Sequence, residues 1–342
     1  MVVPAALMAE PKSRETSRRQ ITLLAVVRHE GDAMQGTPFN PISPQELDIS
    51  NLFIGILIVG AVIFALVTGL VLYIMIRYRH RGGTEEPYQE FGRPRLEIAW
   101  TIAPAVLLVV ILGFTIKTMA AVSPGPGNHP PDLIVTGYQW WWGIQYPAAG
   151  IVTANEVHLP VGKRMLLQLE GGDVIHDFWV PQLGRKMDMI PGHTNWLWVE
   201  PTQTGTFLGA CAEYCGAEHA WMRIRVIVQP QAEFDAWQRQ QAQAAVTPNG
   251  SDAAQGAMLF QQMTCASCHA VTETAASVQI GPNLTHFGSR DTIAAGVLDN
   301  TPDNLTKWLK DPFAVKPGNH MPNLQLTDSQ IRDLVAYLEA QK

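Results

Sequence analysis

The chain has 342 residues, of which 47% are hydrophobic and only 16% are charged. This composition is more apolar than that of an ordinary soluble protein, so a membrane-embedded part is expected beside one or two further folded units. The formal net charge of -6 at pH 7 argues against a nucleic-acid partner.

Residues 1–50 carry no strong pattern. The apolar stretch Ile21–Val27 follows Arg18 and Arg19 and resembles a poor signal-peptide core, but it is short and lacks a clear cleavage site. We therefore expect residues 1–50 to be an N-terminal extension that is signal-like or partly disordered.

Two uncharged apolar runs follow, at Leu52–Ile76 and Ile98–Ile116. The first would extend roughly 37 Å as a helix, enough to cross a bilayer with some tilt. The second is about as long as a span requires, and Pro104 is expected near its first turn, where a missing N–H matters least. A buried core helix is the alternative, which such long uncharged runs disfavour. We predict a transmembrane helix hairpin over residues 51–120.

Basic residues indicate how this hairpin is oriented. The loop between the two runs is rich in arginine, whereas segment 118–140 contains neither Lys nor Arg; the loop residues are Arg77, Arg79, Arg81, Arg93 and Arg95. The positive-inside rule then places the loop in the cytoplasm. The N-terminus and everything after residue 120 are expected on the outer face.

A stiff Pro/Gly-rich linker, Ser123–Pro131, leads to segments with strand character. The segment Arg223–Val228 would place Ile224, Val226 and Val228 on one face of a strand, and Trp196–Val199 and Met165–Leu169 are β-compatible runs. No helical period spans 132–228, so we predict a small β-sandwich or barrel within residues 131–230.

The remaining chain changes character after that unit. A Gln/Ala-rich stretch, Gln231–Val246, is expected to be a helical tail and then a linker, over residues 231–250. Residues 251–342 show helical patterning, and Thr327 is a candidate cap for a helix that carries apolar residues at helical spacing: Ile331, Leu334, Val335 and Leu338.

Two thiols, an imidazole and a thioether lie within the twelve residues from Cys211 to Met222, and His176 is a more distant imidazole. Such soft ligands favour copper or an iron–sulfur cluster. A disulfide between Cys211 and Cys215 is one alternative, and a mononuclear zinc site is another, although zinc sites rarely recruit methionine. Two cysteines, two histidines and a methionine can hold two metal ions if the thiolates bridge.

Residues 45–230, including both spans, resemble subunit II of haem–copper cytochrome c oxidase. The resemblance implies a cupredoxin-like domain with a binuclear copper centre, CuA, in which Cys211 and Cys215 bridge two coppers. The implied ligands are His176, Cys211, Glu213 through its backbone carbonyl, Cys215, His219 and Met222. It also implies that the Glu213 side chain reaches a magnesium ion at the interface with subunit I.

Two further segments carry the same resemblance. Gly137–Trp142 matches the family's aromatic segment, which implies that Trp140 lies on the surface above the coppers and receives the electrons. Core packing or an interfacial belt is the alternative. Leu96–Pro104 matches the start of the family's second span, which implies that Glu97 marks the mouth of a proton channel into subunit I. The alternative is an ordinary headgroup-zone carboxylate.

Cys265-Ala-Ser-Cys268-His269 is typical of covalent haem c attachment. With Gly256 and Phe260 before it, Gly281–Leu284 after it and Met321 later, residues 251–342 resemble a class I cytochrome c, an all-α fold. The resemblance implies two thioether links and axial ligation of the iron by His269 and Met321, with His320 as a competitor. Histidine–methionine ligation suits an electron carrier because it raises the reduction potential.

Together these patterns predict a multidomain membrane protein that is subunit II of a proton-pumping, caa3-type cytochrome c oxidase in a prokaryotic plasma membrane. Electrons would arrive from a soluble cytochrome c or another respiratory complex, pass from haem c to CuA, and enter subunit I, where dioxygen is reduced to water. Subunit III is a further expected partner. Residues 251–342 hold six Lys/Arg and nine Asp/Glu, so tethering would replace electrostatic steering onto the acceptor.

Three other functions are compatible with parts of the pattern. A quinol oxidase subunit II would lack the copper ligands, and nitrous oxide reductase would need a large propeller domain that 342 residues cannot supply. A membrane-anchored copper and haem carrier without a partner oxidase is the remaining alternative. Glu97 and Glu213 argue against it, because both make sense only beside subunit I. Asp188 lies in a segment that resembles the family's subunit interface, and no chemical role is assigned to it.

Overall fold

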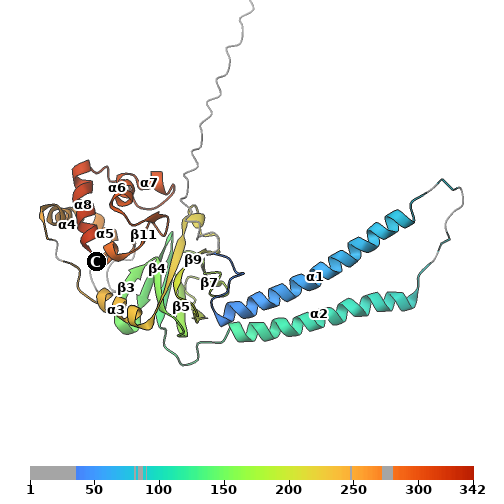
Figure 1. Ribbon diagram of the computed structural model, residues 1–342. Coiled ribbons are helices and arrows are strands. Elements are labelled where there is room, and N and C mark those ends of the chain that lie inside the picture. The colour runs from blue at the N-terminus through green and yellow to red at the C-terminus, as the bar shows by residue number, and fades with distance from the viewer. Residues whose placement is uncertain (1–35, 81, 84–87, 90, 247–248, 272–279) are drawn as a thin grey trace, which may run out of the picture. The chain divides into compact units, whose positions relative to one another are not determined.

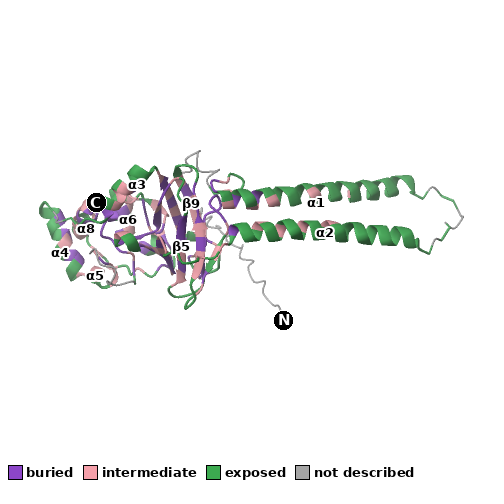
Figure 2. Ribbon diagram, turned by 90° about the horizontal axis from the view of Figure 1, so that it is seen from below, coloured by how far each residue is buried: buried purple, intermediate pink, exposed green. Residues whose placement is uncertain are grey.

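Two long helices begin the structure, a computed structural model that describes residues 36–80, 82–83, 88–89, 91–246, 249–271 and 280–342. Helix α1 (Pro44–Arg77) and helix α2 (Pro94–Val122) lie side by side (Figure 1). Both are long and apolar enough to cross a membrane, and most of their residues are exposed (Figure 2). The two predicted spans are helical, whereas the signal-like stretch Ile21–Val27 lies outside the described residues.

Helix α1 begins before the uncharged run because Ser43 caps it. The Ser43 hydroxyl accepts a hydrogen bond from the backbone N–H of Glu46 at 3.0 Å and donates one to the carbonyl of Leu183 at 2.6 Å. The preceding Ile42 is fully buried in the core of the following β domain. The last residues of the expected N-terminal extension therefore belong to the folded part.

Helix α2 likewise begins earlier than the apolar run, with Pro94 in its first turn. Pro104 consequently lies inside the helix, so its expected place near the first turn is wrong. Membrane-spanning helices tolerate such prolines because hydroxyl side chains and neighbouring helices satisfy the freed backbone groups. The carbonyl that Pro104 leaves without a donor is that of Trp100. The hydroxyl of the neighbouring Thr101 donates instead to the Glu97 carbonyl, at 2.8 Å.

The β domain, residues 133–229, consists of two five-stranded sheets around one core. The first sheet has the order β3 (Ile151–Ala154), β2 (Trp141–Tyr146), β1 (Leu133–Tyr138), β5 (Met165–Gly171) and β8 (Asn195–Val199). The second has the order β4 (Glu156–Pro160), β10 (Arg223–Gln229), β9 (Gly205–Cys211), β6 (His176–Trp179) and β7 (Met187–Met189). Two short 3₁₀ turns complete it, Pro147–Ala149 and His219–Trp221.

This β-sandwich confirms the predicted β character of the segment. In β10 the apolar residues Ile224, Val226 and Val228 are buried and alternate with partly exposed residues, as period-two patterning requires. Strand pairs β1–β5 and β10–β4 are parallel, whereas the other pairs are antiparallel.

Helix α3 (Gln231–Gln241) forms the expected helical tail and packs on strand β4. The Trp237 ring stacks on His158, with centroids 4.0 Å apart. The backbone N–H of His158 donates to the Tyr146 hydroxyl at 2.7 Å, and its Nδ1 lies 2.9 Å from the Gln229 amide oxygen. The stacking on Trp237 attaches the tail to the sandwich, and the two hydrogen bonds hold His158 in place beneath it.

The C-terminal domain, residues 251–342, is mainly helical. Its helices are α4 (Ser251–Gln262), α5 (Cys265–Cys268), α6 (Pro302–Lys310), α7 (Pro312–Val315) and α8 (Asp328–Ala340), with a 3₁₀ turn at Phe287–Ser289 and a hairpin of β11 (Thr292–Ile293) and β12 (Leu298–Asp299). Helices α4 and α8 cross closely at Gly256, where a side chain would meet the backbone of Asp333. The predicted cap at Thr327 is confirmed by a reciprocal capping box with Gln330.

The contact of α3 with β4 predicts an acid-sensitive attachment. Burial lowers the pKa of His158 from 6.5 to about 4, so its neutral form is favoured in the folded state. Stability from this residue is present above pH 6.5 and is lost as the pH falls toward 4. Between pH 7 and pH 5 we expect a loss of roughly 2 kcal/mol, measured by hydrogen exchange of the β4 and α3 amides.

A His158→Gln variant is the control, because glutamine does not titrate in this range. Its exchange protection should change less between pH 7 and pH 5 than that of the natural chain. Equal pH dependence in both proteins would contradict the assignment to His158.

Candidate copper and haem sites

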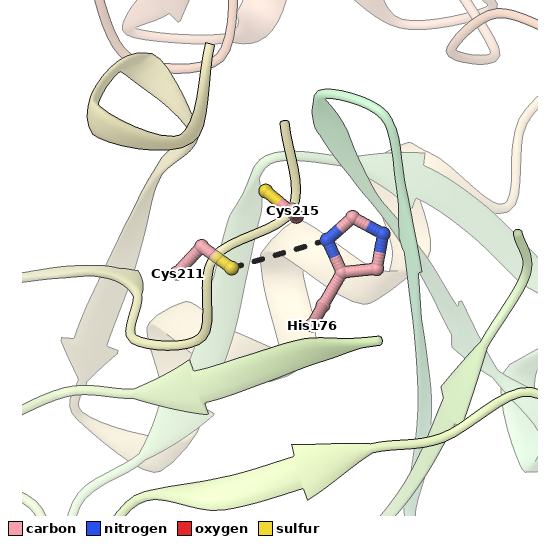
Figure 3. Close-up of side chains that lie close together, drawn as sticks. All are labelled: His176, Cys211 and Cys215. Carbon is pink, nitrogen blue, oxygen red and sulfur yellow. Dashed lines mark hydrogen bonds between the residues drawn. The ribbon is translucent and has the colours of Figure 1, made fainter. Parts of the chain in front are cut away.

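The first candidate site is built where strands β6 and β9 end beside one another. Phe178 pairs with Cys211 in this antiparallel ladder, which brings His176 at the start of β6 toward the end of β9. The loop from β9 to β10 then turns back over the same position. Figure 3 shows His176, Cys211 and Cys215 converging, and their ligand atoms lie within 4.8 Å of one another.

The distances divide the six predicted ligands into two groups. Cys211 Sγ lies 3.9 Å from His176 Nδ1 and 3.2 Å from the Glu213 carbonyl oxygen. Cys215 Sγ lies 3.7 Å from His219 Nδ1 and 3.9 Å from Met222 Sδ. Each group therefore offers a thiol, an imidazole and one weaker donor, a set that fits two soft metal ions sharing the sulfur atoms.

Both cysteines are free, so the arrangement is not a disulfide. A hydrogen bond from Cys215 lowers the pKa of the Cys211 thiol, and the same hydrogen bond, together with burial, raises the pKa of Cys215. Loss of both protons is therefore disfavoured, because adjacent like charges repel. Two cations would supply the charge needed to keep both as thiolates.

Close packing of the backbone fixes the position of the His176 imidazole. Strand β1 passes beside the ring at Gly137, where an added Cβ would lie 2.8 Å from the ring Cγ. Only glycine leaves room for the imidazole there. The aromatic rings of Trp142 and Phe178 are also buried nearby, so the site lies in a water-poor part of the core.

Asp173 is a positioning residue that the sequence interpretation missed. Its Oδ1 lies 2.8 Å from His176 Nε2, which is the ring nitrogen opposite the sulfur ligands. The same carboxylate accepts the backbone N–H groups of Gln139 at 2.7 Å and Val174 at 2.6 Å. Burial alone would lower the pKa of His176, but hydrogen bonding to Asp173 and Cys211 outweighs it and raises that pKa. The Asp-x-x-His spacing was the available sequence signal.

Trp140 does not lie on the surface, so that part of the expectation is wrong. Its side chain is 8% exposed because the loop before Met321 covers it, and the His320 ring lies 4.6 Å from the Trp140 ring. Trp140 Nε1 donates to the Cys215 carbonyl at 3.0 Å, which joins the indole directly to a predicted copper ligand.

The two predicted acidic sites are placed differently from the copper ligands. Glu213 lies in the ligand loop, and its residue is exposed beside the exposed Tyr214. Glu97 lies in the first turn of α2, is exposed, and is not brought near the metal ligands. Asp188 pairs with Asp177 across strands β6 and β7.

The second candidate site is a cavity of about 340 Å³ that is lined mainly by the C-terminal domain. Five residues of the β domain also line it: Gln139, Trp140, Trp141, Asn155 and Glu218. Cys265, Cys268, His269 and Met321 all line it, together with mainly apolar side chains. His269 Nδ1 donates to the Pro282 carbonyl at 2.9 Å, which leaves Nε2 free to bind a metal. Burial lowers the pKa of His269, which favours the neutral ring that ligation requires.

Backbone geometry around this cavity supports haem attachment. An added Cβ at Gly281 would lie 2.6 Å from the His269 ring, so glycine permits the close approach. On the opposite loop, the backbone N–H of Met321 donates to the Asn319 side chain at 2.8 Å. An apolar cavity with two free thiols, an oriented imidazole and a thioether fits a covalent haem c.

Three family models match the chain in succession. They are "Cytochrome C oxidase subunit II, transmembrane domain" at residues 36–117, "Cytochrome C oxidase subunit II, periplasmic domain" at 148–229, and "Cytochrome c" at 253–342. Cytochrome c oxidase subunit 2 of Alkalihalophilus pseudofirmus is 37% identical over 90% of this chain and 91% of its own length. The chain belongs to the cytochrome c oxidase subunit II family.

Further relatives are consistent with this membership. The subunit 2 chains of Bacillus sp. strain PS3 and Bacillus subtilis are 36% and 33% identical, over 78% and 79% of this chain and 80% and 82% of theirs. The crystal structure of the periplasmic domain of cytochrome oxidase subunit II from Bradyrhizobium japonicum is 36% identical, with a TM-score of 0.31, over 32% of this chain and 91% of that one. By the three family models, this subunit II combines two membrane spans, a periplasmic domain and a cytochrome c domain.

The contact between Asp173 and His176 yields a prediction for this subunit II. Asp173→Asn should reduce copper affinity by roughly 10–100-fold, because the imidazole loses the carboxylate that orients it. Competition with a copper chelator, followed by the copper electron paramagnetic resonance signal, measures the change.

Asp235→Asn is the matched control, since Asp235 is a carboxylate of α3 in contact with Gln231. It should retain the affinity of the natural chain. An Asp173→Asn protein that held copper equally tightly would show that Asp173 is not a positioning residue.

Proposed function

We propose that this chain carries electrons within a caa3-type oxidase, from a haem c in its C-terminal domain, through a CuA centre, to subunit I. The observation that carries the proposal is Trp140, which donates to the Cys215 carbonyl and contacts the His320 ring beside Met321. One indole thereby links the ligand loops of both candidate sites. Dioxygen reduction to water and proton pumping would occur in subunit I.

A copper pair and a haem supply reversible one-electron carriers that change little in shape when bound in a rigid scaffold. The chain contributes the rigidity. His176, Cys211, Cys215 and Met222 are buried, and the carbonyl of Glu213 lies beside Cys211. His219 is partly exposed, and Glu213, which would contribute only its backbone carbonyl, is an exposed residue. Side chains held in one packing arrangement reorganise little when a charge arrives, which favours rapid transfer.

The proposed architecture follows the sequence boundaries: an N-terminal extension over 1–50, the membrane hairpin over 51–120, the copper domain over 131–230, the linker over 231–250 and the haem domain over 251–342. The arginine-rich loop would face the cytoplasm, with both termini outside a prokaryotic plasma membrane. The donor would be a soluble cytochrome c or another respiratory complex, and subunit III a further partner.

Glu213 and Glu97 are proposed to act toward subunit I. The Glu213 carbonyl lies beside Cys211 in the copper loop, and the residue is exposed, so its carboxylate is available to a magnesium ion at a subunit interface. Glu97 is exposed in the first turn of α2, which suits the entrance of a proton channel in a partner subunit.

Cofactor analysis of the purified chain tests the proposed function. We expect two coppers and one covalent haem per chain, with a mixed-valence copper signal. Cys215→Ser should remove that signal, since a hydroxyl cannot bridge soft metal ions, while haem content stays unchanged. The proposal would be contradicted if the chain, expressed with copper supplied, contained no copper. It would also be contradicted if the chain purified without a haem–copper partner subunit.

The axial ligand can be assigned by two neighbouring substitutions. Met321→Ala should abolish the iron–methionine absorption band and lower the haem potential, because the thioether stabilises reduced iron. His320→Ala should retain the band. Loss of haem ligation in His320→Ala but not in Met321→Ala would reverse the assignment.

The magnesium role of Glu213 predicts a selective loss. In the assembled oxidase with manganese in place of magnesium, Glu213→Gln should weaken the manganese signal, because an amide is a poorer ligand for a hard cation than a carboxylate. The copper signal should persist, since the backbone carbonyl remains. An unchanged manganese signal would show that Glu213 is not a ligand of the metal at this site.

A further inference from the structure

A buried ion pair joins the β domain to the C-terminal domain. Lys316 Nζ lies 3.0 Å from Glu218 Oε2, and the two side chains are only 4% and 1% exposed. Burial raises the pKa of Glu218 and lowers the pKa of Lys316, while each partner's charge opposes that effect. Buried charges are tolerated only when they stay paired. The ion pair therefore favours the one arrangement of the two domains in which Lys316 and Glu218 meet.

A second buried carboxylate crosses the same boundary. Glu156, 3% exposed at the start of β4, accepts hydrogen bonds from the backbone N–H and the hydroxyl of Thr292, both at 2.8 Å. It also accepts the backbone N–H of Asp291 at 3.2 Å. Three donors from the C-terminal domain thus converge on one buried carboxylate, and both of its oxygens accept a hydrogen bond.

Backbone contacts complete the interface. Arg223 is the first residue of strand β10, and its N–H donates to the carbonyl of Ala295, in the turn between β11 and β12, at 3.2 Å. Gly318, two residues after Lys316, approaches Ala217 so closely that an added Cβ would lie 3.2 Å from the Ala217 Cβ. One contact between backbone groups and one close approach of a glycine to a side chain indicate a specific fit.

The consequence of this fit is the position of His320. The residue follows Lys316 and Gly318 in the same loop and precedes Met321, which lines the haem cavity. Its ring lies 4.6 Å from the ring of Trp140, whose Nε1 donates to the Cys215 carbonyl. A short route therefore runs from the Met321 loop through two aromatic rings to the copper loop.

We propose that Glu218–Lys316 and Glu156 form a fixed dock between the two domains, and that His320 is the positioning residue through which the docked haem domain couples to Trp140. The inference rests on the proposed function. The step served is a single one-electron transfer, in which haem iron is oxidised from the ferrous to the ferric state and the copper pair gains that electron. No bond or proton is exchanged.

The dock is tested in the assembled oxidase with four single variants: Lys316→Met, Glu218→Gln, Glu156→Gln and His320→Ala. Lys310→Met is the matched control, because Lys310 forms an exposed ion pair with Asp328 inside the C-terminal domain. Each preparation is first assayed for haem and copper content. The rate of copper reduction is then followed optically after flash-induced reduction of the haem.

We expect transfer to slow by roughly tenfold or more in Lys316→Met, Glu218→Gln and Glu156→Gln. In these variants the C-terminal domain would be held only by its linker and would have to find its binding position on the β domain before each transfer. The rate should also become dependent on solvent viscosity, and amide exchange in residues 291–296 and 316–321 should increase. His320→Ala should slow transfer without changing exchange. The Lys310→Met oxidase should behave like the natural one.

Paired replacement separates a lost dock from an uncompensated charge. The double variant Glu218→Leu, Lys316→Met leaves no charge unpaired, so it should assemble and recover much of the exchange protection lost in either single variant. If a single variant does not bind its cofactors, the double variant and His320→Ala decide the question.

Failure of the proposed dock and failure of the proposed function would give different results. Full cofactor content with natural rate and exchange in the Lys316, Glu218 and Glu156 variants would overturn the dock, and a natural rate in His320→Ala would overturn its positioning role. Missing copper or haem in the natural chain, or haem electrons that never reach copper there, would instead overturn the proposed function.

Discussion

Two sulfur atoms held next to each other in a buried loop are the constraint on which the rest of this structure depends. Cys211 and Cys215 cannot both lose their protons in the core of a β-sandwich unless cations lie between them. The fold places His176, His219 and Met222 where they would complete the coordination of such cations, and it excludes water from the same place. Gly137 and Asp173 then determine where the imidazole of His176 lies.

Much of this arrangement was predictable because its signals are local in the sequence. The two spans follow from uncharged apolar runs, strand β10 from period-two alternation, and helix α8 from the Thr327 cap. The copper and haem motifs carry most of their ligands within a few residues, so residue chemistry alone indicates soft metals and covalent haem. Those role assignments stay predictions, although the chain brings the predicted ligands together in two sites.

What the sequence did not indicate depends on contacts between distant segments. Trp140 was expected on the surface, but the loop that carries His320 covers it. No local sequence pattern around Trp140 indicates a contact with a loop so far along the chain. The pairing of Lys316 with Glu218 is invisible for the same reason, since lone charged residues usually lie in solvent. Pro104 was misplaced because Pro94 starts the helix ahead of the apolar run.

The covered face of Trp140 has a consequence for competition between electron carriers. A domain attached by a short linker is present at its binding site at an effective concentration of about a millimolar, so a free carrier at micromolar concentration is outcompeted roughly a thousandfold. Mobile carriers in the periplasm would then have to donate at the outer surface of the attached cytochrome domain. Selection on carrier recognition would accordingly act on that domain, while the aromatic face of the copper domain adapts only to its permanent neighbour.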